Sequence, residues 1–186
     1  MNLICIGDRL TFGYCVHLSQ RWTRLCAQET GWELVNEGIN GDTTGGMLAR
    51  MQGGVLAELR EGGLGADRPY VLLMGGSNDV FYSGSDAAAR GNMGAMIHQL
   101  FSVGVLPMVG IPLPADALYA PRAWAAAVDF EAAERTMKEY CAWLKRYCTA
   151  FGVPYIDFCA DFLSPTDRSA RSCCSTVCTR RRRDTA

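Results

Sequence analysis

The chain has 186 residues, of which 49% are hydrophobic and 20% charged, and its formal net charge at pH 7 is -1. This length and apolar content predict one globular domain with its own core. The near-neutral charge, with both signs interspersed, argues against nucleic acid or an acidic membrane surface as partner. No apolar run is long enough to span a membrane, and no basic region of a signal peptide precedes the first apolar segment, so we expect a cytoplasmic protein.

Short apolar runs alternate with helical patterns along the chain. Strands are predicted at residues 3–6, 33–36, 70–74, 106–111 and 154–158. Helices are predicted at residues 20–30, 44–60, 86–103 and 130–151. The last helix has an apolar stripe that we interpret as core, formed by Met137, Tyr140, Cys141, Leu144, Tyr147 and Cys148. Strand and helix in alternation predict a parallel sheet with helices on both faces.

The placement of the nine cysteines argues against disulfides and against a metal site. Four of them, Cys5, Cys26, Cys141 and Cys148, lie in predicted strands and helices, where cysteines are usually small buried hydrophobic residues kept reduced in the cytosol. The cysteines at 173, 174 and 178 lack the paired spacing or nearby histidines of a zinc site. We therefore expect no metal site.

Glycine-rich turns follow the first three predicted strands. They are Gly-Asp-Arg-Leu-Thr-Phe-Gly at residues 7–13, Asn-Glu-Gly-Ile-Asn-Gly-Asp-Thr at 36–43 and Gly-Gly-Ser-Asn-Asp at 75–79. Each turn alone has an ordinary backbone explanation, because Gly, Asn and Asp favour turns. Asp8, Asp42 and Asp79 are expected to cap or brace neighbouring backbone N–H groups.

In their order and spacing, the three turns resemble the motif blocks of the SGNH, or GDSL, family of serine hydrolases, which includes lipases, esterases and acylhydrolases. The resemblance covers residues 1–162. It implies an α/β fold with three α/β/α layers and a five-stranded parallel sheet in the flavodoxin-like order 2-1-3-4-5. It also implies hydrolysis of a small-molecule ester or acyl substrate through an acyl-serine intermediate, without cofactor or metal.

The resemblance assigns roles to three residues. Arg9 occupies the position of the nucleophilic serine, and the oxyanion donors would be the backbone N–H groups of Arg9 and Gly41 and the side-chain amide of Asn78. The alternative for Gly41 and Asn78 is turn formation alone. A guanidinium stays protonated and has no lone pair to offer, so Arg9 cannot be the nucleophile. Other hydroxyls and thiols near the turns, at Thr11, Cys15, Ser19 and Ser77, do not occupy the nucleophile position.

The family's closing Asp-x-x-His block is missing. The chain has only His17, in a polar loop, and His98, in a predicted helix, and neither is placed to replace that block. From about residue 166 the sequence has no amphipathic period, and a shifted reading frame over 173–184 is compatible with Leu-Leu-Asp-Gly-Leu-His-Pro-Thr-Pro-Glu-Gly-His. We therefore predict a family domain at 1–162 followed by an out-of-frame tail at 163–186, with loss of the final helix. The rival interpretation of the arginines at 180–183 is a nucleic-acid-binding tail.

These observations predict a hydrolase scaffold that is inactive in this version, a pseudoenzyme. The alternative is a binding module in which Arg9, beside Gly41 and Asn78, holds a carboxylate or another anion. A third possibility is an unrelated flavodoxin-like protein with coincidental turns. Phe81, Tyr82, Trp124 and the loop at 113–121 are candidates to surround a ligand, although exposed aromatic loops are also ordinary.

Overall fold

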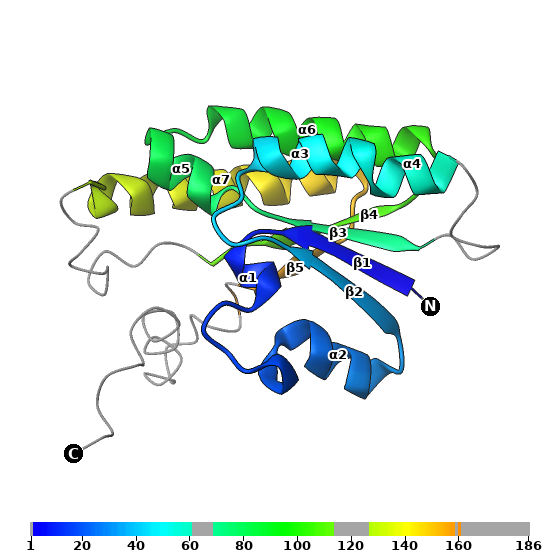
Figure 1. Ribbon diagram of the computed structural model, residues 1–186. Coiled ribbons are helices and arrows are strands. Elements are labelled where there is room, and N and C mark those ends of the chain that lie inside the picture. Colours follow the sequence, from blue (N-terminus) through cyan, green and yellow to red (C-terminus); the bar gives the residue numbers. More distant parts are fainter. Residues whose placement is uncertain (1, 61–68, 114–126, 159, 161–186) are drawn as a thin grey trace, which may run out of the picture.

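The chain folds around a parallel five-stranded sheet in the order β2-β1-β3-β4-β5, as predicted (Figure 1). The computed structural model describes residues 2–60, 69–113, 127–158 and 160. The strands are β1 (Asn2–Gly7), β2 (Glu33–Gly38), β3 (Tyr70–Met74), β4 (Pro107–Ile111) and β5 (Tyr155–Asp157). Every neighbouring pair of strands is parallel, so the carboxyl ends of the five strands lie at one edge of the sheet.

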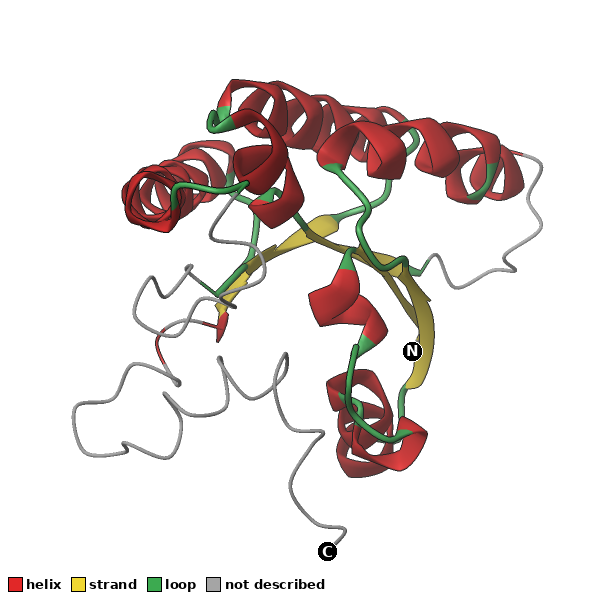
Figure 2. Cartoon of the chain, turned by 60° about the vertical axis from the view of Figure 1, so that its left-hand side comes forward, coloured by secondary structure: helices red, strands yellow, loops and turns green. Residues whose placement is uncertain are grey.

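The helices form a layer on each side of the sheet. They are α1 (Arg9–Phe12), α2 (Trp22–Thr30), α3 (Thr44–Gly53), α4 (Val55–Arg60), α5 (Ser77–Ser83), α6 (Ala87–Ser102) and α7 (Phe130–Phe151), with a 3-10 helix η1 (Leu18–Gln20) before α2. Figure 2 shows α1 and α2 on one side of the sheet and the other helices on the opposite side. This arrangement confirms the predicted three-layer α/β/α architecture.

The observed elements differ from the predicted ones at the glycine-rich segments. The predicted helix at 44–60 is two helices, because α3 ends at Gly53 and Gly54 takes a non-helical conformation before α4. The first and third glycine-rich segments, predicted as turns, continue into the short helices α1 and α5. Helices of four to seven residues contain too few turns to show a 3.6-residue repeat of apolar residues, so the sequence pattern does not indicate them.

The larger part of the core lies between the sheet and the layer that contains α3, α5, α6 and α7. Ile4 and Ile6 of β1 face this side, whereas Leu3 and Cys5 belong to a smaller cluster on the opposite face. Because side chains alternate along a strand and both faces are covered, all four are buried. The predicted stripe on α7 is confirmed for the buried residues Met137, Tyr140, Cys141, Leu144 and Cys148, and Tyr147 is half-buried beside them.

The described cysteines within the elements are free thiols. Cys5, Cys141 and Cys148 are buried, and Cys26 is half-buried on α2. Burial raises the pKa of Cys5 to about 12 and that of Cys148 to about 11, so both thiols stay protonated and act as apolar packing groups. The predicted tail at 163–186, with its cysteines and its arginine run, lies outside the described residues, as do Trp124 and residues 114–121.

Candidate active site

The three motif blocks meet at the carboxyl edge of the sheet. β1 lies between β2 and β3, and each of these strands ends in one of the glycine-rich segments. β1 leads into α1, β2 into the loop at 39–43 and α3, and β3 into α5 (Figure 1). In an open α/β sheet this edge is where ligands bind, and the reversal of strand order at β1 makes it a topological switch point.

Asp8 starts α1 and is completely buried. Its Oδ1 accepts a hydrogen bond of 2.9 Å from the N–H of Leu10, whereas Oδ2 is buried without a hydrogen-bond partner. Burial, the largest cause, raises the pKa of this carboxyl to about 6. The Leu10 N–H and the charge of Arg9 lower the pKa, and the charges of Asp42 and Asp79 raise it. The expected capping role of Asp8 is confirmed.

Arg9 is the first residue of α1, at the end of β1. Its side chain is half-buried, and its guanidinium carbon lies 5.7 Å from the centroid of the Phe81 ring on α5. A cation at this distance from an aromatic face is attracted by the negative face of the ring. The side chain of Arg9 therefore reaches toward α5.

The end of β2 is held tightly against α1. A Cβ on Gly38 would lie 2.2 Å from the backbone N of Phe12, so a side chain at this position would push α1 away. Asn36 donates from Nδ2 to the carbonyl of Thr11 at 2.7 Å and to Oγ1 of Thr23 at 3.0 Å. These contacts fix the height of α1 above the sheet, and with it the position of residue 9.

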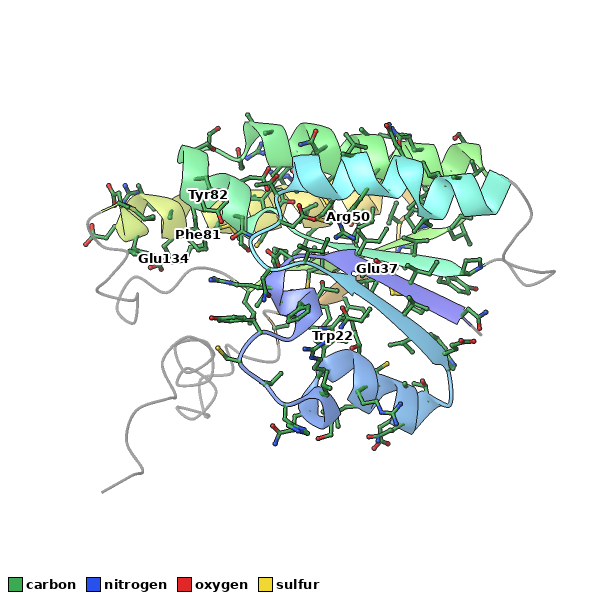
Figure 3. All side chains as sticks on the ribbon, viewed as in Figure 1. Trp22, Glu37, Arg50, Phe81, Tyr82 and Glu134 are labelled. Atoms are coloured by element: carbon green, nitrogen blue, oxygen red, sulfur yellow. The ribbon has the colours of Figure 1, made fainter. Side chains whose placement is uncertain are left out.

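Arg50 on α3 links the first and second motif blocks. Its Nε lies 2.8 Å from Asp42 Oδ2, and its Nη2 donates to the carbonyl of Gly7 at 3.0 Å. Figure 3 shows Arg50 between α3 and the sheet. Asp42 was expected to brace a backbone N–H group, but its described ion pair is with this guanidinium. No local sequence pattern indicates the role of Arg50, because its contact with Gly7 joins residues 43 positions apart.

α5 attaches the third block to the second. Asn78, which is almost fully buried, donates from Nδ2 to the carbonyl of Asp42 at 2.7 Å. Asp79 accepts from the N–H of Thr44 at 2.9 Å and from its Oγ1 at 2.7 Å, so the bracing role expected for Asp79 is confirmed. The loop that contains Gly41 is thus fastened to α5 at its C-terminal end, through Asp42 and Thr44.

Two glycines and a tyrosine set the start of α5. Gly76 has φ +113°, and a Cβ there would lie 2.4 Å from the ring of Tyr140. Tyr140 of α7 is fully buried and donates from its hydroxyl to the carbonyl of Gly75 at 3.0 Å. Only glycine fits both the left-handed backbone and the space beside the ring. Tyr140 was predicted as core, and its polar contact with this turn was missed.

Arg9, Gly41 and Asn78, the three residues singled out from the sequence, lie on these linked segments. Gly41 has φ +79°, and Tyr82 Oη lies 3.5 Å from the position that a Cβ on Gly41 would take. Asn78 binds the next residue of the same loop, and Arg9 contacts the neighbouring ring of Phe81. α5 therefore contacts both the loop at 39–43 and the start of α1.

The other nucleophile and base candidates lie in different surroundings. Thr11 and Ser77 are buried, and Ser19 is exposed in η1. His17 is exposed and accepts from the N–H of Ser19, which caps η1. His98 lies 2.9 Å from the Tyr147 hydroxyl, near the end of α6 that leads toward the amino end of β4, opposite the motif edge.

A cavity of about 270 Å³ lies beside β1 and β2. Its lining combines apolar side chains with three charged ones, Arg50, Glu33 and Glu37. Within the described part of the chain, no group of three or more His, Cys, Asp or Glu residues could hold a metal ion. The described helices also include none that is long and apolar enough to cross a membrane.

The fold and its motif edge define an α/β protein of the SGNH-hydrolase class. Residues 5–175 match the model of the GDSL-like lipase/acylhydrolase family, and the chain belongs to this family. A comparison with curated protein sequences gives no match.

Solved structures of several family members and esterases have the same fold. A member of the lipolytic G-D-S-L protein family from Desulfitobacterium hafniense DCB-2 is 23% identical, with a TM-score of 0.70 over 89% of this chain and 81% of the other. An aryl esterase from M. smegmatis is 19% identical, with a TM-score of 0.70 over 84% and 83%. Est24, a carbohydrate acetylesterase from Sinorhizobium meliloti, is 18% identical, with a TM-score of 0.70 over 84% and 83%. At these identities the likeness establishes the fold.

Proposed function

We propose that the motif edge is an ester-binding site of the family type and that this chain does not hydrolyse esters through an acyl-serine. The observation that carries the proposal is Arg9 at the first position of α1, where the family places its nucleophile. Attack on an ester carbonyl needs a lone pair on a group that can lose a proton, and a guanidinium offers none. The substrate class is a small-molecule ester or acyl compound.

Three donors would stabilise the negative oxygen that forms during acyl transfer. They are the backbone N–H groups of Arg9 and Gly41 and the second amide hydrogen of Asn78, whose first hydrogen is donated to Asp42. Each such donor typically contributes about 2.7 to 4 kcal/mol to transition-state stabilisation. Support comes from the linkage of all three residues through α5 and the loop at 39–43.

The test compares ester turnover in matched variants. p-Nitrophenyl acetate is offered to this chain, to Arg9→Ser, and to Arg9→Ser with residues 173–184 replaced by the twelve-residue shifted-frame block. Arg9→Ala with the same replacement controls for loss of the arginine without gain of a hydroxyl. We expect turnover above the Arg9→Ala control only where serine and the block are both present. No gain in that variant would contradict the assignment of position 9.

The tail belongs to the same proposal. We propose that residues 163–186 are translated out of frame and that the Asp-x-x-His block was lost with them. The nucleotide sequence of codons 166 to 186 tests this directly, because a single insertion or deletion should restore the block. An uninterrupted frame with no such change would favour a genuine tail. We further propose a cytoplasmic location, as the sequence predicts.

A second function is favoured by the charge that replaces the nucleophile. Arg9 places a guanidinium at the end of β1, and guanidinium groups bind carboxylates through charge-assisted hydrogen bonds. We propose that the site binds a carboxylate, the chemical form of the acid product of ester hydrolysis. The carboxylate would lie between the Arg9 side chain and the N–H of Gly41.

Thermal-shift measurements with acetate, longer carboxylates and phosphate test carboxylate binding. We expect carboxylates to raise the melting temperature of this chain and Arg9→Ala to remove the shift. Arg24→Ala, which removes an exposed arginine on α2, is the matched control for loss of one positive charge. The proposal fails if no anion shifts the melting temperature, or if Arg9→Ala leaves the shift unchanged.

A further inference from the structure

We infer that Phe81 and Tyr82 make the site selective for an aromatic carboxylate, a ligand with a planar ring beside its carboxyl group. This inference rests on the proposed carboxylate binding at Arg9 and names the ligand class of the same site. It is carried by two proximities, Phe81 to Arg9 and Tyr82 to Gly41. Figure 3 shows Phe81 and Tyr82 on α5.

The spacing along α5 places each of these side chains next to Asn78. Phe81 and Tyr82 follow Asn78 by three and four residues, and positions at those intervals are neighbours on a helix surface. Asn78 is buried and holds the carbonyl of Asp42, so its direction fixes which side of α5 faces the loop at 39–43. Each aromatic residue therefore lies about one helical turn beyond Asn78, with Phe81 nearly buried and Tyr82 exposed.

Tyr82 provides the outer contact. Its side chain is 67% exposed, yet its hydroxyl is the nearest group to the space above Gly41, 3.5 Å from the position that a Cβ would take. A carboxylate that accepts from the N–H of Gly41 would therefore meet this hydroxyl, which can donate to an oxygen of the ligand. The exposed ring remains available for stacking with a planar group.

Phe81 provides the inner contact. It is nearly buried, packs against Phe130 with ring centroids 6.1 Å apart, and lies 5.7 Å from the guanidinium carbon of Arg9. This packing holds the ring in place before a ligand arrives, which reduces the entropy lost on binding. Arg9 thus lies against an aromatic surface, and a planar group attached to the bound carboxylate would lie near that surface and the Tyr82 ring.

Three aspartates near Gly41 are paired or buried, so an anion can bind beside Gly41. Asp42 is paired with Arg50, and both carboxylate oxygens of Asp79 accept hydrogen bonds from Thr44. Asp8 is fully buried at the start of α1. Asp8 and Asp79 are therefore buried and Asp42 is paired, whereas Tyr82 is exposed. Arg9 supplies the positive charge for a carboxylate, and the aromatic pair supplies the preference for its attached group.

The test measures dissociation constants by isothermal titration calorimetry, with the full chain and three carboxylates. Benzoate is the aromatic probe, cyclohexanecarboxylate is a saturated probe of the same ring size, and acetate lacks a ring. We expect benzoate to bind about 3- to 10-fold more tightly than either of the others, since an aromatic contact contributes about that factor. Equal affinity for benzoate and cyclohexanecarboxylate would overturn aromatic selection.

Variants at the exposed ring complete the test. Tyr82→Ala should weaken benzoate about 3- to 10-fold and acetate less than the ring probe, and Tyr82→Phe should keep most of the preference for a ring. Tyr155→Ala removes another exposed tyrosine, on the edge strand β5, and should leave all affinities unchanged. The inference fails if Tyr82→Ala has no effect on benzoate or if the Tyr155→Ala control has the same effect.

The three carboxylates distinguish aromatic selectivity from carboxylate binding at Arg9. Acetate binding that disappears in Arg9→Ala, without a preference for benzoate, would preserve carboxylate binding and reject the aromatic selection. Absence of binding for all three carboxylates would reject both. Circular dichroism of each variant confirms folding, which the exposure of Tyr82 and Tyr155 should leave intact.

Discussion

Asp8 is expected to make the stability of this protein fall as the pH rises. The carboxyl is fully buried at the start of α1, and burial raises its pKa from 3.8 to about 6. The folded state therefore binds the proton more tightly than the unfolded chain does. The stabilising effect of the bound proton is complete below pH 3.8 and is lost as the pH rises through about 6.

The size of the effect follows from the shift of about two pKa units. One unit corresponds to 1.36 kcal/mol, so ionisation of Asp8 lowers the free energy of unfolding by about 3 kcal/mol at neutral pH. Asp8→Asn removes the ionisation while its side-chain oxygen can still accept from the N–H of Leu10. Urea unfolding of both proteins at pH 4 and pH 7.5 is the assay. We expect the asparagine variant to gain about 2 kcal/mol relative to the parent between these pH values.

The measurement relies on a difference between two pH values, so packing changes caused by the substitution itself cancel to first order. The charge of Arg9 lowers the pKa of Asp8, and the charges of Asp42 and Asp79 raise it. The reasoning is refuted if the free energies of unfolding of Asp8→Asn and the parent differ by the same amount at pH 4 and at pH 7.5. That result would mean that the Asp8 carboxyl has the same pKa in the folded and unfolded states.

Three further substitutions test the backbone and packing at the motif edge by urea unfolding. Cys15 is the only described non-glycine residue with positive φ, at 64°, so Cys15→Gly should raise the free energy of unfolding by about 1 kcal/mol; a decrease would mean that the backbone there is unstrained. Tyr140→Phe removes the buried hydrogen bond to the carbonyl of Gly75 and should lower the free energy of unfolding by about 1 to 3 kcal/mol. An unchanged free energy would show that this bond does not stabilise the fold. Gly76→Ala places a Cβ against the Tyr140 ring on a backbone with positive φ, so the free energy of unfolding should fall by at least about 2 kcal/mol. An unchanged free energy would contradict the close approach of Gly76 to Tyr140.

The sequence predicts the scaffold well because alternation of apolar runs and helical periods depends on local patterns. The strand at Tyr70–Met74 and the helix at Phe130–Phe151 were predicted with their observed bounds. Strand order came from the resemblance, since periodicity carries no information on which strands are neighbours. The short helices α1 and α5 were missed because they are shorter than the window in which a helical period becomes visible.

The three sequence motifs predict where the candidate site lies. They do not predict the contacts that hold its segments together. Arg50 reaches the carbonyl of Gly7 across 43 residues, and Tyr140 reaches Gly75 across 65 residues. Such contacts arise from the packing of α3 and α7 on the sheet, which no local pattern specifies. The aromatic residues Phe81 and Tyr82 were recognised as candidates, but their relation to Arg9 and Gly41 required the direction of α5.

The central claim is that position 9 is the nucleophile position of a family site and that arginine there prevents acyl transfer. A fluorophosphonate probe, followed by peptide mass spectrometry, tests it most directly in chains that carry the shifted-frame block at 173–184. We predict a covalent adduct on residue 9 in Arg9→Ser and no adduct there in the parent sequence. Labelling elsewhere in both chains, or no labelling at residue 9 in Arg9→Ser, would contradict the account.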